Sequence, residues 1–574
     1  MTLLTPHARW LATGFWPTAL ASLLAACLCA PVLSLFVSAL GANTQQWVHL
    51  IGFVIPDAAL TTLLLLTGVG IAVVLLGTGA AWLVTAFQFP GRKVLAWALL
   101  LPLAVPTYVV AYSYLDLLHP LGPVQSVLRA ALGVSSPREL RLPDIRSMLG
   151  AILILGSVLY PYVYLSARPM FLTQPANLIE AARGLGHGPL SLFWRVALPM
   201  ARPAIVVGTT LALLETFNDV GASEFLGLQT LTVAVYSTWI TRSDLAGAAY
   251  IALFMLVLVL GLSALERHAR RQQRFINTDQ SRPMQAQPLK RWQGLLASLF
   301  CLLPVLAGFV IPVLHLGWQA AVRLEQVGAV SSLLKDATLN TVLISLAVTS
   351  CTVLGGLLLA WAARSWTTRR SASLGQRLER TATIGYALPG TVLALGLLAP
   401  FTLIDELANV LSESLFQTTT GLWLLGTSAG LILACTLRLL AVASGSLDAG
   451  FARIPLAFDQ LARSLGHSPL GVLLRVDLPL LKPAMFSAAL LVFVETMKEL
   501  PITLLLRPLN VETLATWLYG EAARGTYEEG AIAALLIILV SLIPVILLTR
   551  TQTQYKKKQA LKPTVPVSPS EGSL

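Results

Sequence analysis

About a dozen apolar runs divide this chain, and each is long enough to cross a lipid bilayer as a helix. A membrane-spanning helix needs about 20 apolar residues to cross about 30 Å of hydrocarbon. The composition agrees, because 56% of the residues are hydrophobic and only 11% are charged, whereas about a quarter are charged in a typical soluble domain. The sequence therefore predicts an all-α polytopic membrane protein with about 12 transmembrane helices.

Twelve apolar windows give the expected spans. They lie near residues 14–40, 58–86, 95–117, 147–168, 202–222, 245–265, 293–316, 336–363, 380–403, 420–440, 482–503 and 530–549. An even number of spans places both termini on one side. By the positive-inside rule that side is the cytoplasm, as marked by the clusters Arg267, Arg270, Arg271 and Arg274; Arg364, Arg369 and Arg370; and Lys556, Lys557 and Lys558. The loop after the third span departs from the rule, since it carries Arg129, Arg138, Arg141 and Arg146.

The net charge of +12 does not predict nucleic-acid binding, because the basic residues lie in short loops between apolar runs, where they orient helices and contact anionic lipid. The cysteines lie inside apolar runs, and their spacing fits neither a metal site nor a disulfide scaffold: Cys27, Cys29, Cys301, Cys351 and Cys435. The segment Leu24-Ala25-Ala26-Cys27 resembles a lipoprotein cleavage box. However, the apolar run continues to Leu40, which favours a first membrane helix over a cleaved signal.

The chain repeats itself at an offset of 280 residues. The repeated pairs include Leu185-Gly186-His187 with Leu465-Gly466-His467, Arg195-Val196 with Arg475-Val476, Leu198-Pro199 with Leu478-Pro479, Pro203-Ala204 with Pro483-Ala484, and Glu215-Thr216 with Glu495-Thr496. Six spans separate equivalent points, so the halves have the same orientation and form a parallel repeat. The predicted divisions are residues 1–265, a basic cytoplasmic linker 266–292, residues 293–550, and a disordered cytoplasmic tail 551–574.

The strongest part of the repeat is a polar segment between the fourth and fifth spans of each half, at 175–200 and 455–480. Each copy reads as a helix–turn–helix. The expected signals are an opening Pro175 or Pro455, a left-handed Gly186 or Gly466, a first-turn Pro189 or Pro469 with Ser468 as cap, and a closing Pro199 or Pro479. Short polar helices on the cytoplasmic face of a membrane protein are expected to bind a partner protein.

This segment resembles the coupling loop of binding-protein-dependent ABC importer permeases. The residues that carry the resemblance are Glu180, Ala181, Ala182, Gly186 and Pro199 in the first copy, and Gln460, Ala462, Gly466 and Pro479 in the second. The resemblance implies that each loop docks in a groove of an ATP-binding subunit, so two such subunits are expected on the cytoplasmic face. The second copy has Gln460-Leu461-Ala462 in place of Glu-Ala-Ala, which predicts two different docking contacts.

No phosphate-binding loop of the form Gly-x-x-x-x-Gly-Lys-Ser/Thr occurs in the sequence. The chain is therefore expected to be no enzyme and to bind no cofactor itself, with ATP on the partner subunits.

Acidic residues at apolar depth follow each coupling loop: Glu215 and Asp219 in the first half, and Glu495 and Glu499 in the second. The four-residue spacing places each pair on one helical face, and the common offset makes the pairs pseudo-symmetry mates. Intramembrane carboxylates mark a substrate pathway or a partner, and four of them would suit a hard cation. Alternatively, they pair with Lys498, cap broken helices or lie at the outer interface. Because Pro501 follows Glu499, that helix is expected to end there.

The surrounding residues resemble the ferric iron branch of these importers. The resemblance rests on Phe493 through Pro501, Thr503 through Pro508, Glu512 through Thr516 with Tyr519, Asp219 through Ala222, and Thr230 through Tyr236. It implies a bacterial inner-membrane permease that receives ferric iron from a periplasmic binding protein and works by alternating access. Thiamine, a polyamine or an aminophosphonate stays open as cargo, and an ion-coupled secondary transporter is the alternative from another class.

Overall fold

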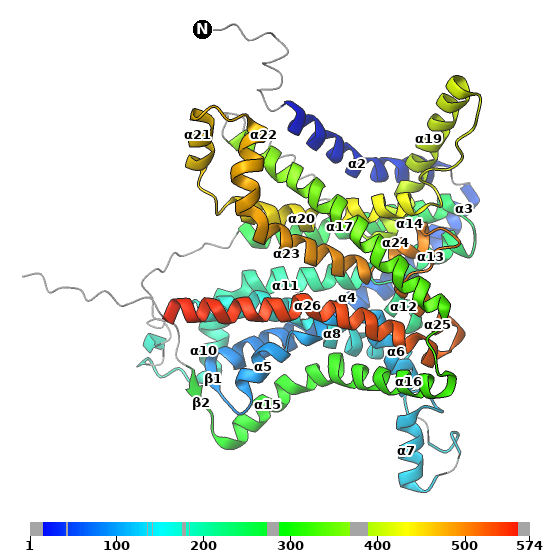
Figure 1. Cartoon of the computed structure of the whole chain (residues 1–574). Helices are drawn as coiled ribbons and strands as arrows, with labels where there is room; N and C mark the ends of the chain where they lie inside the picture. Colours follow the sequence, from blue (N-terminus) through cyan, green and yellow to red (C-terminus); the bar gives the residue numbers. More distant parts are fainter. Residues whose placement is uncertain are drawn as a thin grey trace, which may run out of the picture.

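The computed structural model describes residues 15–41, 44–134, 136–140, 142–174, 180–182, 184–271, 286–367 and 388–560 (Figure 1). In the first half the elements are α2 (Phe15–Leu40), α3 (Thr44–His49), η1 (Leu50–Val54), α4 (Ile55–Ala86), β1 (Phe87–Gln88), α5 (Arg92–Ala98), η2 (Leu101–Ala104), α6 (Thr107–Leu117), α7 (Pro123–Leu132), α8 (Met148–Leu172), α10 (Pro189–Leu192), η3 (Phe193–Ala197), α11 (Leu198–Asn218), α12 (Gly221–Phe225), α13 (Leu231–Ile240) and α14 (Leu245–Arg271).

The second half has a related but not identical order of elements. Its elements are β2 (Gln287–Pro288), α15 (Arg291–Val305), η4 (Leu306–Val310), α16 (Ile311–Val327), α17 (Ser332–Thr367), α19 (Gly390–Phe416), α20 (Ser428–Phe451), α21 (Leu456–Ser464), α22 (Pro469–Val472), η5 (Leu473–Asp477), α23 (Leu478–Met497), α24 (Pro501–Leu506), α25 (Leu514–Arg524) and α26 (Tyr527–Ala560). The strands β1 and β2 form a two-residue parallel pair, and helices make up nearly all the rest. The all-α polytopic prediction is confirmed.

Ten helices in the described part of the chain are long and apolar enough to cross a membrane, and the bent α5–α6 pair makes an eleventh. The remaining expected span, 14–40, corresponds to α2, whose Cys29–Leu40 portion is a shorter apolar helix. The expected third span at 95–117 is not one straight helix, because it turns by 90° before Thr107. Pro106 stands at this break with ψ 143° and precedes α6 as its N-cap residue. An extended residue interrupts the helical ladder, so the chain must change direction there.

Several expected boundaries in the second half are displaced, and the third and fourth spans of that half are examples. The span expected at 380–403 is α19, which continues to Phe416, and the span expected at 420–440 is α20, which continues to Phe451. Hydropathy marks where apolar residues end, whereas these helices extend beyond their apolar windows with polar residues. Residues 368–387 lie outside the described part. At the outer limits, α14 continues past 265 to Arg271 and α26 continues past 550 to Ala560.

Equivalent hydrogen bonds confirm the repeat in three dimensions. Ser147 caps α8 and Thr427 caps α20, each by accepting a hydrogen bond from a glycine N–H three residues on. Likewise the Thr62 hydroxyl accepts from the Leu231 N–H at 2.9 Å, and the Thr341 hydroxyl accepts from the Leu514 N–H at 2.8 Å. The coupling elements α10, α21 and α22 lie at one end of the molecule (Figure 1), as a parallel repeat requires.

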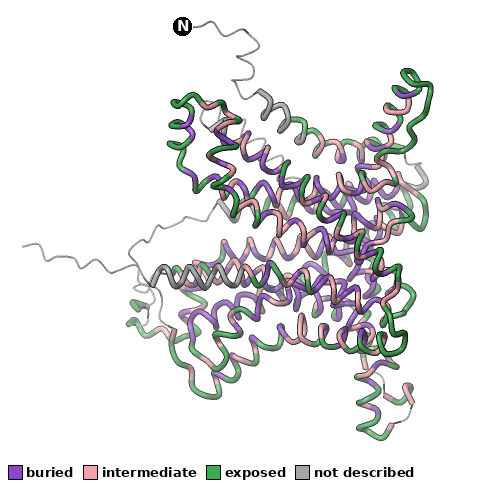
Figure 2. The backbone as a smooth tube through the Cα atoms, in the orientation of Figure 1, coloured by how far each residue is buried: buried purple, intermediate pink, exposed green. Residues whose placement is uncertain are grey.

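The first helix of each half packs against the other half. Helix α2 contacts α17 and α19, whereas α15 contacts α4, α5 and α8. The buried core around α4 and α8 accordingly includes Cys301 and Val305 from α15. Buried residues concentrate at the centre of the bundle, whereas the α21 region and the far end of α19 are mostly exposed (Figure 2). The two halves therefore share part of their buried cores.

Helices α4 and α8 pack against each other extensively, and a glycine allows their close approach. A Cβ added at Gly77 would lie 2.7 Å from the carbonyl oxygen of Tyr160, so only glycine permits this approach. Small residues at such crossings are typical of membrane helices, where close van der Waals packing replaces the hydrophobic effect. The opposite side of α4 exposes leucines such as Leu60 and Leu64, which suits contact with lipid.

Candidate transport cavity and coupling surface

Helices α11 and α23 both end at the acidic positions singled out in the sequence. Asp219 follows α11, and its Oδ1 accepts the Ala222 N–H of α12 at 2.8 Å. Glu499 follows α23 in the same way, and its Oε1 accepts the Ile502 N–H of α24 at 3.1 Å. The expected helix end before Pro501 is therefore observed, and each carboxylate caps the short helix that comes next.

All four acidic residues line one cavity of about 640 Å³, a volume that includes its open mouth. The walls come from both halves, and the lining residues are Leu103, Val105, Pro106, Thr107, Tyr108, Val158, Leu159, Tyr162, Glu215, Asn218, Asp219, Val220, Gly221, Arg438, Glu495, Lys498, Glu499, Leu500 and Pro501. The structure thus brings together the residues that the 280-residue offset paired. It also adds two cations, Arg438 and Lys498, to the same cavity.

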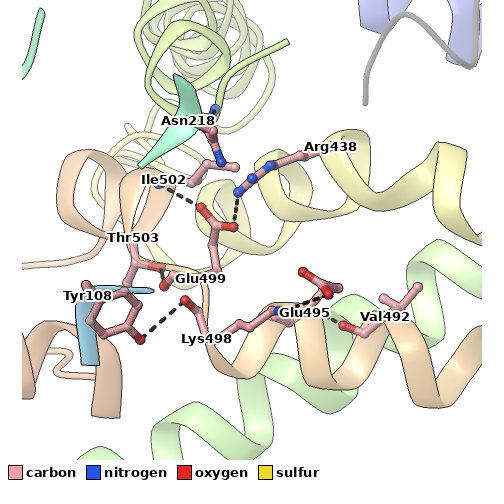
Figure 3. A network of polar contacts seen from close by, with 11 residues as sticks. Tyr108, Asn218, Arg438, Val492, Glu495, Lys498, Glu499, Ile502 and Thr503 are labelled. Carbon is pink, nitrogen blue, oxygen red and sulfur yellow. Dashed lines mark hydrogen bonds and ion pairs between the residues drawn. The ribbon is translucent and has the colours of Figure 1, made fainter. Parts of the chain in front are cut away.

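The second-half carboxylates are ion-paired (Figure 3). Arg438 from α20 contacts Glu499 through Nη1, and both side chains are mostly buried. The Lys498 Nζ lies 2.8 Å from Glu495 Oε1, where the Glu495 side chain is 37% exposed. The alternative roles considered from the sequence, pairing with Lys498 and capping of broken helices, are therefore both present here.

The first-half carboxylates have no such partners. Neither Glu215 nor Asp219 forms an ion pair with any residue that the structure describes. At the offset of 280, Val158 stands where the second half has Arg438, and Asn218 stands where it has Lys498. Asn218 instead accepts the Gly390 N–H at 2.7 Å. Four carboxylates and two cations leave two net negative charges in the cavity when all are ionised.

The cavity is not a ready-made metal centre. Across the described ranges, no group of three His, Cys, Asp or Glu side chains is arranged to hold a metal ion. The five cysteines are free thiols in the structure. Glu215 nevertheless lies close enough to Glu495, Lys498 and Arg438 to interact with their charges.

Sequence reasoning missed Arg438. A single arginine inside the apolar run 420–440 is costly in a membrane and normally pairs with an acidic side chain. The sequence therefore contained a signal that could have identified Arg438. Tyr108 was missed for a different reason. It reaches the carbonyl oxygen of Lys498 at 3.4 Å across 390 residues (Figure 3), a contact that no local pattern encodes.

The first coupling unit is described in part, since residues 175–179 and 183 lie outside the described ranges. Glu180, Ala181 and Gly186 are exposed, whereas Ala182 is buried. Gly186 has φ +83°, which confirms the predicted left-handed turn. Pro189 begins α10 as expected.

The second coupling unit follows the same plan. Gln460 is exposed and Ala462 is buried, and both lie on α21. Gly466 has φ +86°, and the Ser468 hydroxyl accepts the Gly471 N–H at 3.1 Å to cap α22. Leu461 and Leu465 are exposed, so this polar segment presents apolar side chains beside the turn.

The prediction that Pro199 and Pro479 close the coupling units is wrong. Each proline lies in the first turn of α11 or α23, and one continuous helix runs through it, over Pro189–Asn218 and Pro469–Met497. A π-helical turn precedes each proline, and in the first half the Leu198 N–H donates to Phe193 O, five residues back. This wider turn accommodates a residue without an N–H, so the coupling helix continues directly into the membrane span.

Comparison with known proteins matches this arrangement to one family. The family described as "Binding-protein-dependent transport system inner membrane component" matches the chain twice, at residues 74–274 and 352–558. The chain is 26% identical to the Fe(3+)-transport system permease protein FbpB 2 of Haemophilus influenzae, over 93% of this chain and 98% of that protein.

Shorter relatives match part of the chain. It is 31% identical to the putative 2-aminoethylphosphonate transport system permease protein PhnU of Salmonella choleraesuis, over 34% of this chain and 68% of that protein. It is 29% identical to the molybdenum transport system permease protein ModB of Escherichia coli, over 31% of this chain and 78% of that protein. The chain belongs to the family of binding-protein-dependent transport system inner membrane components and carries the permease domain of that family twice.

Proposed function

We propose that this permease imports ferric iron, and that its cavity is the place through which the cation passes. The observation that carries the proposal is a cavity between the halves with two carboxylates that form no ion pair with any described residue. The chain also aligns over nearly its whole length with a ferric iron permease. Carboxylate oxygens are hard ligands that suit a hard, highly charged cation. A transport site must also release its ion, which is consistent with the absence of a three-residue metal cluster from the described part of the chain.

The cation binds first to Glu215 and Asp219 in this proposal. Glu495 and Glu499 already have Lys498 and Arg438 as counter-ions, so their charge is neutralised. Coulomb attraction for an arriving cation is therefore strongest on the first-half wall. Arg438 and Lys498 reduce the affinity of the cavity and thereby assist release.

The energy comes from partner subunits. As a permease subunit of an ABC importer, the chain performs no covalent chemistry. We propose that two ATP-binding subunits dock at the coupling units, that a periplasmic binding protein delivers cargo at the opposite face, and that both termini are cytoplasmic in a bacterial inner membrane. ATP-driven closure of the ATPase pair then shifts the permease between inward-facing and outward-facing states, because nucleotide and cargo bind the two states with different affinity.

A second cargo class has its own support. The cavity contains two cations beside the carboxylates, and PhnU is 31% identical over 198 residues. A zwitterion with an ammonium and a phosphonate group would satisfy both signs of charge. 2-Aminoethylphosphonate is therefore the alternative cargo.

The test is uptake of radiolabelled ferric iron by iron-starved cells with and without the chain. Labelled 2-aminoethylphosphonate, thiamine and putrescine serve as parallel cargoes. We expect chain-dependent uptake of iron alone, lost on ATP depletion even when the proton gradient is maintained. If the chain increases uptake of another label and leaves iron uptake unchanged, the assignment of iron as cargo is wrong. If uptake follows the proton gradient and not ATP, the ATP-driven importer mechanism is contradicted.

A further inference from the structure

A buried ion pair lies beneath the second coupling unit. The Arg364 Nε lies 2.9 Å from Asp459 Oδ2, and its Nη2 lies 2.8 Å from Asp459 Oδ1. Both side chains are less than a tenth exposed. Such a two-point contact fixes the orientation of both planar groups. It therefore connects α17, which carries Arg364, rigidly to α21, the docking helix.

The same guanidinium reaches a third element. It donates to the carbonyl oxygens of Phe451 at 3.0 Å and Ile454 at 3.2 Å, and its Cζ lies 5.2 Å from the centre of the Phe451 ring. Phe451 is the last residue of α20. Arg364 thus joins the cytoplasmic ends of two membrane helices to the docking helix in one contact.

A second carboxylate adds to this cluster. Asp477, in the turn that leads into α23, is 1% exposed, and among the described residues its Oδ1 accepts no hydrogen bond. Its charged neighbours include Asp459 and Arg364. Arg364 therefore offsets negative charge from both helices of the second coupling unit.

The first half lacks these three charged residues at the aligned positions. At the repeat offsets, Thr85 stands in place of Arg364, Ile179 in place of Asp459 and Ala197 in place of Asp477. In the first half the carboxylate is the exposed Glu180, one residue further on. In the second half Gln460 occupies that position, and the neighbouring carboxylate instead points inward to Arg364.

We propose that Arg364 and Asp459 form a positioning pair that makes α21, α17 and α20 move as one body when an ATP-binding subunit pulls on the second coupling unit. In the first unit, uncharged residues stand at the equivalent positions. The two docking contacts consequently differ in mechanism as well as in sequence. This inference rests on the family of the chain and is independent of its cargo.

The test is a distance measurement by spin labelling in the complete complex with its ATP-binding subunits. One label is placed on the exposed Cys351 of α17 and the other at Leu465→Cys beside α21, with the other native cysteines replaced. In the parent protein the distance between the labels should be the same without nucleotide and with ATP trapped by vanadate. In Arg364→Gln with Asp459→Asn, the distance distribution should broaden and shift on trapping.

The double variant is chosen because it removes both partners of the pair, so neither Arg364 nor Asp459 is left as an uncompensated buried charge. Asp477 loses the positive charge of Arg364 but also loses the repulsion from Asp459, and Arg463 stays as its positive neighbour. Arg364→Lys, which keeps the charge but loses the two-point geometry, should give an intermediate distribution. Thr85→Val, at the equivalent position of the first half, is the matched control and should change nothing. We also expect transport per ATP hydrolysed to fall about fivefold or more in the double variant, within the usual range of coupling between sites. A double variant with parental distances and parental transport per ATP would overturn the proposal.

Discussion

The first-half and second-half walls of the cavity are formed by equivalent positions of the 280-residue repeat, yet they differ in charge. In the second half Arg438 and Lys498 neutralise Glu499 and Glu495, whereas in the first half Glu215 and Asp219 have no ion-pair partner among the described residues. The backbone plan is the same on both sides, because Asp219 and Glu499 cap equivalent short helices. The comparison teaches that two copies of one backbone plan can carry different electrostatics, with ion-paired carboxylates on one wall and carboxylates without a described ion-pair partner on the other.

The largest expected effect follows from Arg438→Leu, which gives the second wall an apolar residue like Val158 of the first. Removal of one partner from a buried pair costs about 3–5 kcal/mol, because the other charge is left uncompensated. We expect Glu499 to be left in that state and the purified protein to unfold at a clearly lower temperature. The measurement is thermal unfolding in detergent.

Arg438→Leu combined with Glu499→Gln is the control for that change. The neutral glutamine removes the uncompensated charge, so most of the lost stability should return. If the double variant is as unstable as the single one, Arg438 supports the fold by some contact other than Glu499.

The next effect separates the two roles of Asp219. Asp219→Asn keeps an oxygen that can accept the Ala222 N–H, so α12 stays capped while the charge is lost. We expect iron uptake to fall about tenfold, equivalent to about 1.4 kcal/mol, with little change in stability. Asp219→Ala should additionally lose about 1 kcal/mol of stability through the missing cap. Normal uptake by Asp219→Asn would mean that Asp219 only caps the helix.

The smallest effect tests the coupling units. Ser468 caps α22, whereas the equivalent Gly188 precedes α10 without a side-chain cap. A Cβ at Gly188 would meet no atom within 4 Å, so Gly188→Ser should be tolerated and should stabilise the protein. Ser468→Gly should cost only a few tenths of a kcal/mol. The measurement is the thermal unfolding temperature of each variant. A lower unfolding temperature for Gly188→Ser would show that the two coupling units differ in local structure.

The sequence was sufficient to predict the features that depend on local patterns. Apolar runs predicted the membrane helices, the 280-residue offset predicted the repeat, and glycine and proline spacing predicted the turns at Gly186 and Gly466. The acidic positions at the ends of α11 and α23 were also identified. All of these depend on residues near one another in the chain, where periodicity and turn chemistry determine the result.

The contacts between distant segments could not be predicted in the same way. Arg438 lies 61 residues from Glu499, and nothing local indicates which carboxylate it meets. The packing of α2 on the second half and of α15 on the first likewise depends on the tertiary fold. The continuous helix through Pro199 was missed because a π-turn accommodates a proline that usually marks a helix boundary.

The most direct test of the difference between the walls is a matched comparison of iron uptake at equal membrane levels of protein. Glu215→Gln removes one unpaired charge from the first wall, whereas Glu495→Gln with Lys498→Met removes an ion pair from the second wall without a change in net charge. We predict a loss of about tenfold or more for Glu215→Gln, or at least about 1.4 kcal/mol, and a loss of no more than about threefold for the pair. Equal losses, or a larger loss from the second wall, would contradict the assignment of the cation to the first half.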